Sequence, residues 1–124
     1  MPIDIPAGSD FENFQMKVTD QDGNEIAFQD FDTVYVTLVD EHGGTVAKYD
    51  TAGTDNPLAL VDTTGTGDKE TLELDIFGDD ISKYTFETHV FAQIDVEYAS
   101  RVGYSGSYKR LFADKHVINI FKRL

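Results

Sequence analysis

Apolar and polar residues alternate along most of this chain with the period of two that is typical of β-strands. The segment TVYVTLV (33–39) gives the strongest example, because Val34, Val36 and Leu38 fall on one side of an extended chain. Similar alternation, or short runs of β-branched and aromatic residues, predicts strands at 14–18, 33–39, 45–49, 58–61, 71–76, 84–98 and 116–121. Helical periodicity is weak, and only one helical turn is expected, within 78–83.

Turn-forming residues separate these predicted strands. They are Asp22-Gly23, Gly43-Gly44, the cluster at 51–57, TTGTGD at 63–68 and GDD at 78–80. About seven to nine short strands at roughly ten-residue spacing predict an all-β fold, an antiparallel sandwich or barrel. No composition shift marks a linker, so residues 1–124 are expected to form one domain.

Two segments, VTDQDGNEIAF (18–28) and LVDEHGGTVAKY (38–49), share one order of residue types. Each has apolar residues, an Asp, further polar residues, a Gly and then apolar residues again. Gly tolerates positive φ and Asp can accept hydrogen bonds from the backbone of its own turn, so this order favours a hairpin. We therefore predict two strand–turn–strand units of one kind.

The first hairpin also carries oxygen ligands at alternate positions, Asp20, Asp22 and Asn24. A calcium-binding helix–loop–helix site needs Gly at position 6 and Glu at position 12, where this chain has Glu25 and Phe31. We therefore predict no metal site. Asp20, Asp22 and Asn24 stay the candidates for an incidental calcium ion, at a rim where further aspartates could converge: Asp30, Asp32, Asp79 and Asp80.

Charge is unevenly spread along a chain whose net charge is −13. The first 108 residues hold 5 Lys and Arg against 22 Asp and Glu, a net −17, whereas the last 16 hold 5 against 1, a net +4. An acidic body repels nucleic acid and anionic lipid, so neither is expected as a partner. The basic end is suited to an acidic protein surface, including that of an identical subunit. A charge run of this kind can equally be no more than a solvated surface.

Residues for catalysis are sparse. With no cysteine, the chain cannot use a thiolate as nucleophile or metal ligand. The histidines, His42, His89 and His116, show neither metal-ligand spacing nor a nucleophile elbow, and His89 alternates with polar and aromatic neighbours as a packing or surface residue would. TGTGDKET lacks the Gly-Lys-Ser/Thr of a phosphate loop. We predict a non-enzymatic protein that needs no cofactor.

The segment YASRVGYSGSYKRLF (98–112) has the composition of a binding surface. Tyr supplies a large contact area with few rotatable bonds, Ser and Gly let the backbone adapt, and Tyr and Arg are enriched at interface hot spots. The alternative is a hairpin whose tyrosines pack on the sandwich. HVINIFKRL (116–124) is expected to form a buried final strand, and otherwise an arm that adds to a neighbour's sheet. The interface candidates are Tyr98, Arg101, Tyr104, Tyr108, Lys109, Arg110, Phe112, Lys122 and Arg123.

The segment GDDISKYTFETHVF (78–91) resembles the corner before the second-last strand of an immunoglobulin-like domain. Its acidic turn leads to Tyr84, and Phe86 stands two residues later, where antibody domains carry a cysteine. Together with the preceding order of strand, Asp-Gly hairpin, acidic-aromatic link, strand and Gly hairpin, residues 9–91 resemble the immunoglobulin-like modules of tailed-phage virion proteins. Those modules include the N-terminal domain of the baseplate upper protein and small structural proteins of phages of gut bacteria.

This resemblance implies an immunoglobulin-like β-sandwich of seven to nine strands with a long connection, at about 92–114, before the last strand. It also implies a virion structural or adaptor protein that decorates a capsid, joins head to tail or connects baseplate and fibre. Its partners would be other virion proteins or copies of itself, with assembly in the host cytoplasm. The alternative function is a carbohydrate-binding or host-attachment sandwich, with or without calcium.

Overall fold

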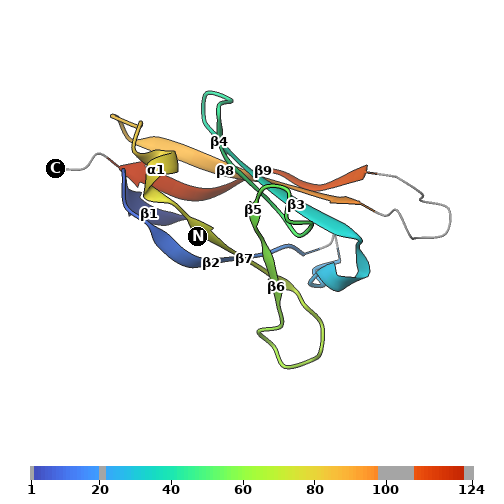
Figure 1. Ribbon diagram of the computed structural model, residues 1–124. Helices are drawn as coiled ribbons and strands as arrows, with labels where there is room; N and C mark the ends of the chain where they lie inside the picture. Colours follow the sequence, from blue (N-terminus) through green and yellow to red (C-terminus); the bar gives the residue numbers. More distant parts are fainter. Residues whose placement is uncertain (1, 20–21, 98–107, 122–124) are drawn as a thin grey trace.

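The chain folds into two β-sheets stacked face to face, as seen in the computed structural model, which describes residues 2–19, 22–97 and 108–121 (Figure 1). These residues form nine strands: β1 (Ile3–Pro6), β2 (Phe11–Lys17), β3 (Thr33–Asp40), β4 (Thr45–Asp50), β5 (Asn56–Pro57), β6 (Ala59–Val61), β7 (Thr71–Ile76), β8 (Thr88–Glu97) and β9 (Tyr108–Phe121). A 3-10 turn η1 (Phe28–Asp30) and one short helix α1 (Gly78–Ile81) complete the elements. No helix in the described part of the chain is long and apolar enough to cross a membrane.

The two sheets form an all-β sandwich. One sheet runs β1-β9-β8-β3-β4-β5 and the other runs β2-β7-β6. Immunoglobulin domains of the variable type likewise extend the G-F-C sheet with strands C′ and C″ and oppose it with B, E and D. β1 pairs with β9 and β4 pairs with β5 in parallel, so the antiparallel arrangement predicted from sequence holds for the other strand pairs.

The core lies between the two sheets and follows the predicted alternation. In β3 the buried residues are Val34, Val36 and Leu38, as the period of two required. The neighbouring strands contribute Val90, Ala92, Ile94 and Val96 of β8 and Leu72, Leu74 and Ile76 of β7. A hydrogen bond joins the layers, because the buried Tyr49 hydroxyl of β4 donates to the carbonyl of Asp75 in β7 over 2.9 Å.

The predicted bounds of the long connection, 92–114, were wrong, because both ends of that range belong to strands. β8 continues to Glu97 and β9 begins at Tyr108, and the two pair antiparallel. The prediction of a buried last strand is confirmed at its C-terminal half. β9 lies inside its sheet, with Val117, Ile118 and Ile120 buried.

The corner before β8 differs from what the immunoglobulin resemblance implies. β8 begins at Thr88, and Phe86 precedes it with 81% of its surface exposed, so this side chain does not occupy the core position of an antibody cysteine. Tyr84 does connect the corner to the sheet, because its hydroxyl donates a hydrogen bond to Asp40 Oδ2 at the end of β3 over 2.9 Å. The helical turn expected within 78–83 is confirmed as α1.

Candidate functional site

The longest strand of the protein leaves part of one edge open. β9 pairs with β8 from Tyr108 to Ile120, but β1 covers its other side only from Ile118 to Phe121. Among the described strands, β8 is therefore the one strand that pairs with β9 before Ile118. Unpaired N–H and C=O groups along an edge can hydrogen-bond an added strand.

A groove of about 170 Å³ separates this open edge from β2 of the other sheet. The Lys115 ammonium donates across it to the carbonyl of Lys17 over 3.0 Å. Lys17 in turn lies 3.4 Å from Glu25 and 3.8 Å from Glu70, measured from its ammonium to the carboxylate oxygens. The groove is lined by Phe14, Gln15, Met16, Lys17, Lys115, His116 and Val117.

The predicted interface residues divide between β9 and chain outside the described residues. Tyr98, Arg101, Tyr104, Lys122 and Arg123 lie outside the described residues. The other four belong to β9. In its pairing with β8, Tyr108 is opposite Glu97, Lys109 opposite Val96, Arg110 opposite Asp95 and Phe112 opposite Ile94. The strand register thus gives the pairing of these four residues with β8, and the chain between Glu97 and Tyr108 lies outside the described residues.

The calcium candidates sit in a turn. Thr19 and Glu25 form an antiparallel bridge around it, and Gly23 has φ +85°, so the Asp-Gly hairpin prediction is confirmed. Asp20 lies outside the described residues, and Asp22 and Asn24 are exposed. The chain then enters η1, so the second arm is a single bridge and not the strand seen after the β3–β4 turn.

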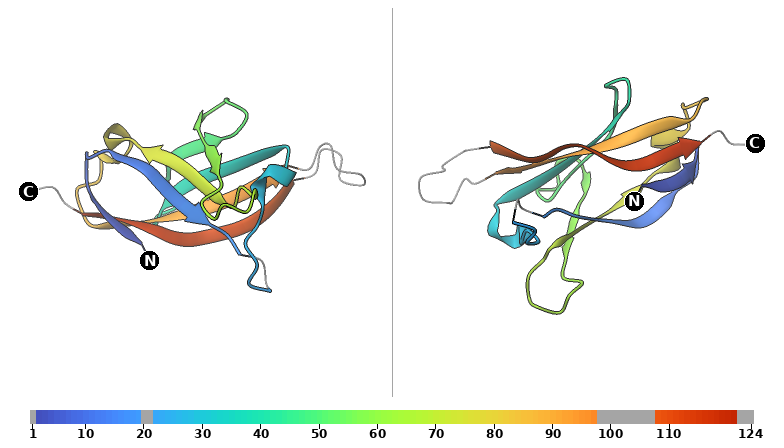
Figure 2. Two further views of the ribbon diagram at one scale, coloured as in Figure 1. Left: turned by 90° about the horizontal axis from the view of Figure 1, so that it is seen from below. Right: turned by 180° about the vertical axis from the view of Figure 1, so that it is seen from behind.

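The described aspartates of the expected rim do not converge. Figures 1 and 2 place α1, which carries Asp79 and Asp80, and η1, which carries Asp30, at opposite ends of the sandwich. Among the described residues, no group of three or more His, Asp or Glu side chains is arranged to hold a metal ion.

Aspartates at the ends of strands organise the loops that follow. Asp40 accepts hydrogen bonds from the N–H groups of His42 and Gly44, each over 2.9 Å. Burial by itself would raise the pKa of Asp40, but hydrogen bonds from Gly44, from the Tyr84 hydroxyl and from His42 outweigh it, so the pKa lies below its ordinary value.

The loop after β6 is built in the same way around Asp62. Its carboxylate accepts from the N–H groups of Thr64, Gly65 and Gly67 over 2.8 to 3.1 Å. These bonds, that from Gly67 first, lower the pKa of Asp62. Many of the acids that give the chain its charge therefore have a structural role in its turns.

Glu70 is a buried carboxylate beside β7. Its Oε1 accepts from the N–H of Thr63 over 2.9 Å and from the hydroxyls of Thr63 and Thr71, whereas its buried Oε2 has no hydrogen-bond partner among the described residues. The hydrogen bond from the Thr63 hydroxyl, opposed by burial and aided by further bonds, lowers the pKa of Glu70 from 4.5 to about 2.

This depressed pKa predicts an acid-sensitive contribution to stability. Because the folded state holds Glu70 ionised more strongly than the unfolded state does, its contribution is complete above about pH 4.5 and is lost as pH falls toward about 2. We expect Glu70→Gln to lower the melting temperature at pH 7, with a gap to wild type that narrows between pH 4.5 and 2. Thermal unfolding followed by circular dichroism measures this gap. Glu12→Gln, at an exposed side chain, controls for net charge, and a gap that stays constant down to pH 2.5 would contradict the prediction.

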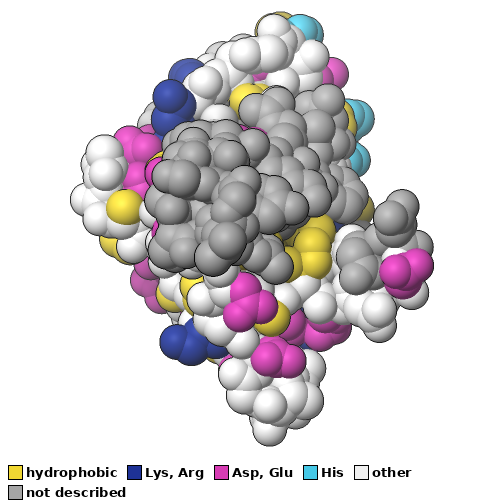
Figure 3. All heavy atoms as spheres, turned by 90° about the vertical axis from the view of Figure 1, so that its right-hand side faces the viewer, with side chains coloured by type: hydrophobic (Ala, Val, Ile, Leu, Met, Phe, Trp, Pro, Cys, Tyr) yellow, Lys and Arg dark blue, Asp and Glu magenta, His cyan; other side chains and the backbone are white. Residues whose placement is uncertain are grey.

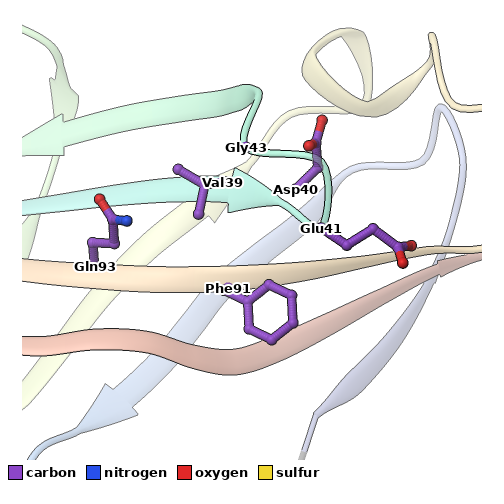
Figure 4. Close-up of a pocket in the computed structure, with 6 residues that line it drawn as sticks. All are labelled: Val39, Asp40, Glu41, Gly43, Phe91 and Gln93. Atoms are coloured by element: carbon purple, nitrogen blue, oxygen red, sulfur yellow. The ribbon is translucent and has the colours of Figure 1, made fainter.

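The outer face of the six-stranded sheet carries an open pocket of about 420 Å³. Figure 4 shows Phe91 and Gln93 on β8 beside the end of the β3–β4 hairpin, where Asp40, Glu41 and Gly43 lie. Val39 completes the lining. An aromatic ring next to carboxylate and amide groups provides one apolar face and several hydrogen-bonding groups for a small polar ligand.

Next to this pocket, two histidines that are far apart in the sequence come together. The ring centroids of His89 on β8 and His116 on β9 are 4.8 Å apart, and the Phe91 ring lies 5.2 Å from that of His116. The expectation that His89 is a packing or surface residue is confirmed, since it is exposed and packs across strands. Sequence spacing could not reveal the pair, because only the register of β8 and β9 brings it together.

Comparison of the chain with protein-family models, with curated proteins and with solved structures finds no match. Any assignment of function therefore depends on the chain's own residues and geometry.

Proposed function

We propose that this protein is a non-enzymatic docking module, a structural or adaptor protein of a phage virion that binds a neighbouring protein along the open edge of β9. The observation that carries the proposal is the strand order at this edge: β1 covers β9 only from Ile118 to Phe121, and a groove borders β9 just before that point. An extended segment of a partner can add to such an edge through main-chain hydrogen bonds, with side chains entering the groove.

Charge supports an acidic partner. Lys109, Arg110 and Lys115 all lie on the open part of β9, within an end of the chain that carries a net +4. Among the described side chains visible in Figure 3, Asp and Glu occur at several places and Lys and Arg at few. The acidic body of a second copy, or of another virion protein, would complement this edge and speed association. Lysines on an edge also discourage unspecific strand pairing.

The edge can be tested with two variants of equal charge change. Lys109→Gln/Arg110→Gln should weaken association and flatten its dependence on salt, whereas Lys48→Gln/Lys83→Gln, away from the edge, should leave both unchanged. Self-association is measured by light scattering at low and high salt, and incorporation into particles by copurification. Incorporation of the edge variant at the wild-type level would refute the proposal.

The pocket on the outer sheet face favours a second candidate function, carbohydrate binding in host attachment. Phe91 offers an apolar face to a sugar ring, and Glu41 and Gln93 border it. This second function predicts a monomer that binds a glycan through the pocket and loses binding on Phe91→Ala. A glycan-array screen of the wild type and of Phe91→Ala distinguishes carbohydrate binding from docking at β9.

A further inference from the structure

We propose that His89 and His116 form a binding site for a divalent late transition metal, of the class Cu²⁺, Ni²⁺ or Zn²⁺, on the outer face of the six-stranded sheet. Imidazole nitrogen is a ligand that suits all three ions. The site includes His116, the last residue of the open stretch of β9, but metal binding there does not depend on the docking function.

The pair exists because of a bulge between β8 and β9. His89 is opposite Asn119 and Phe91 is opposite His116, with a register shift between Val90 and Phe91. Because β9 has an extra residue there, the side chains of His116 and Asn119, three positions apart, both lie on the outer face and hydrogen-bond to each other. Without the bulge, the alternation of a regular strand would direct these two side chains to opposite faces.

A chain of hydrogen bonds selects one tautomer of the neutral His116 ring. Asn119 Nδ2 donates to the carboxylate of Asp4 over 3.1 Å, and this orients the Asn119 amide so that its Oδ1 faces His116. Because Oδ1 can only accept, the His116 Nε2 that lies 2.8 Å away must carry the proton. In the neutral ring Nδ1 then keeps its lone pair. This is the arrangement by which outer-sphere groups orient a metal-binding histidine.

The spacing of the two rings fits chelation. A metal about 2.0 to 2.1 Å from a ring nitrogen lies about 3.2 Å from the ring centroid. Two imidazoles bound at angles of about 90° to 110° then have centroids about 4.5 to 5.2 Å apart, as square-planar and tetrahedral geometries require. The observed separation of 4.8 Å lies within this interval. With the ring planes 41° apart, the pair would bind one ion once rotation turns His116 Nδ1 and a nitrogen of His89 toward a common point.

Glu41 lies at the border of the site. Its Oε1 accepts from the backbone N–H of His89 over 3.1 Å, which places a carboxylate next to the histidine pair. The two imidazoles would supply the protein ligands, and water would complete the coordination. Two protein nitrogens select late transition metals over Ca²⁺ and Mg²⁺, which prefer oxygen ligands and which the many surface acids would bind without preference for this face.

The test is metal binding to the purified full chain, measured by isothermal titration with Cu²⁺ and Zn²⁺ and, for Cu²⁺, by the nitrogen couplings in its electron paramagnetic resonance spectrum. We expect His89→Ala/His116→Ala to weaken Cu²⁺ binding at least ten-fold and to remove the two-nitrogen signature. His42→Ala, which removes the third histidine from a turn, should bind as wild type does. Asn119→Ala should weaken binding several-fold while keeping both nitrogens.

Circular dichroism without metal verifies that each variant is folded, which is expected because His89 is exposed and His116 is half-buried. Equal affinity in wild type and the double variant would overturn the proposal, because binding would then be through surface carboxylates. A wild-type spectrum with fewer than two coupled nitrogens would overturn it as well.

Discussion

A Gly78→Ala variant is expected to lose about 3 kcal/mol of its free energy of unfolding, a large share of the roughly 5 to 15 kcal/mol typical of a folded domain. An alanine Cβ at this position would lie 2.2 Å from the carbonyl oxygen of Gly8 and 2.7 Å from its carbon. These are backbone atoms, so no side-chain rotation relieves the overlap. The Gly78 N–H also donates to Asp10 over 2.6 Å, and moving the chain apart would break that bond. Urea unfolding followed by circular dichroism gives the change.

Gly53→Ala serves as the matched control. Gly53 has φ +83°, and an added Cβ there would have no atom within 4 Å, so its substitution costs only the left-handed backbone conformation, about 1 to 2 kcal/mol. The expected order of stability is therefore Gly78→Ala below Gly53→Ala below wild type. Equal losses in the two variants would show that close packing against Gly8 does not limit the corner before α1.

The sequence predicted a turn at Gly78 but not the reason for its glycine. Composition marks GDD as a break between strands, whereas the requirement comes from Gly8, which is 70 residues earlier in the chain. Local patterns carry turn propensity, and close approach between distant segments leaves no local pattern.

The contrast between local patterns and contacts of distant segments also explains which strands could be predicted from sequence. Interior strands such as β3 and β7 face one layer of core, so their alternation is readable and predicts them nearly to the residue. β1, with the sequence IDIP, and the two-residue β5 lie at sheet edges, where pairing across the sheet and not burial on one face defines the strand. The polar first half of β9 resembles a loop in sequence because pairing with β8, and not an apolar alternation, defines it as a strand.

The candidate sites were predictable in part. Residue types selected 98–112 as a candidate docking segment, which stays a prediction, and its described part, 108–112, belongs to β9. The His89–His116 pair was beyond reach, because the two residues meet through a bulge whose register depends on the whole sheet. Hydrophobic periodicity fixes which face a strand buries but does not fix which residues of two strands are neighbours.

Asp50→Ala is expected to lower the free energy of unfolding by about 3 kcal/mol, because one buried carboxylate holds the whole turn that follows β4. Asp50 is only 2% exposed. Its Oδ1 accepts from the N–H groups of Gly53 over 2.8 Å and Thr54 over 3.0 Å, and its Oδ2 accepts from Asp55 over 3.2 Å. Alanine would leave three N–H donors without their acceptor, and water can replace only some of these bonds in a partly buried turn.

Two further variants separate the carboxylate's hydrogen bonds from its charge. Asp50→Asn keeps one acceptor oxygen for Gly53 and Thr54, so about half the loss is expected. Asp55→Ala removes an equal charge from an exposed side chain and should change stability by about 0.5 kcal/mol or less. If Asp50→Ala behaved like Asp55→Ala in urea unfolding, the carboxylate would not hold the turn. If it behaves as expected, the acids at the strand ends stabilise the fold through specific hydrogen bonds, and the strong negative charge of the chain is partly a consequence of how its turns are built.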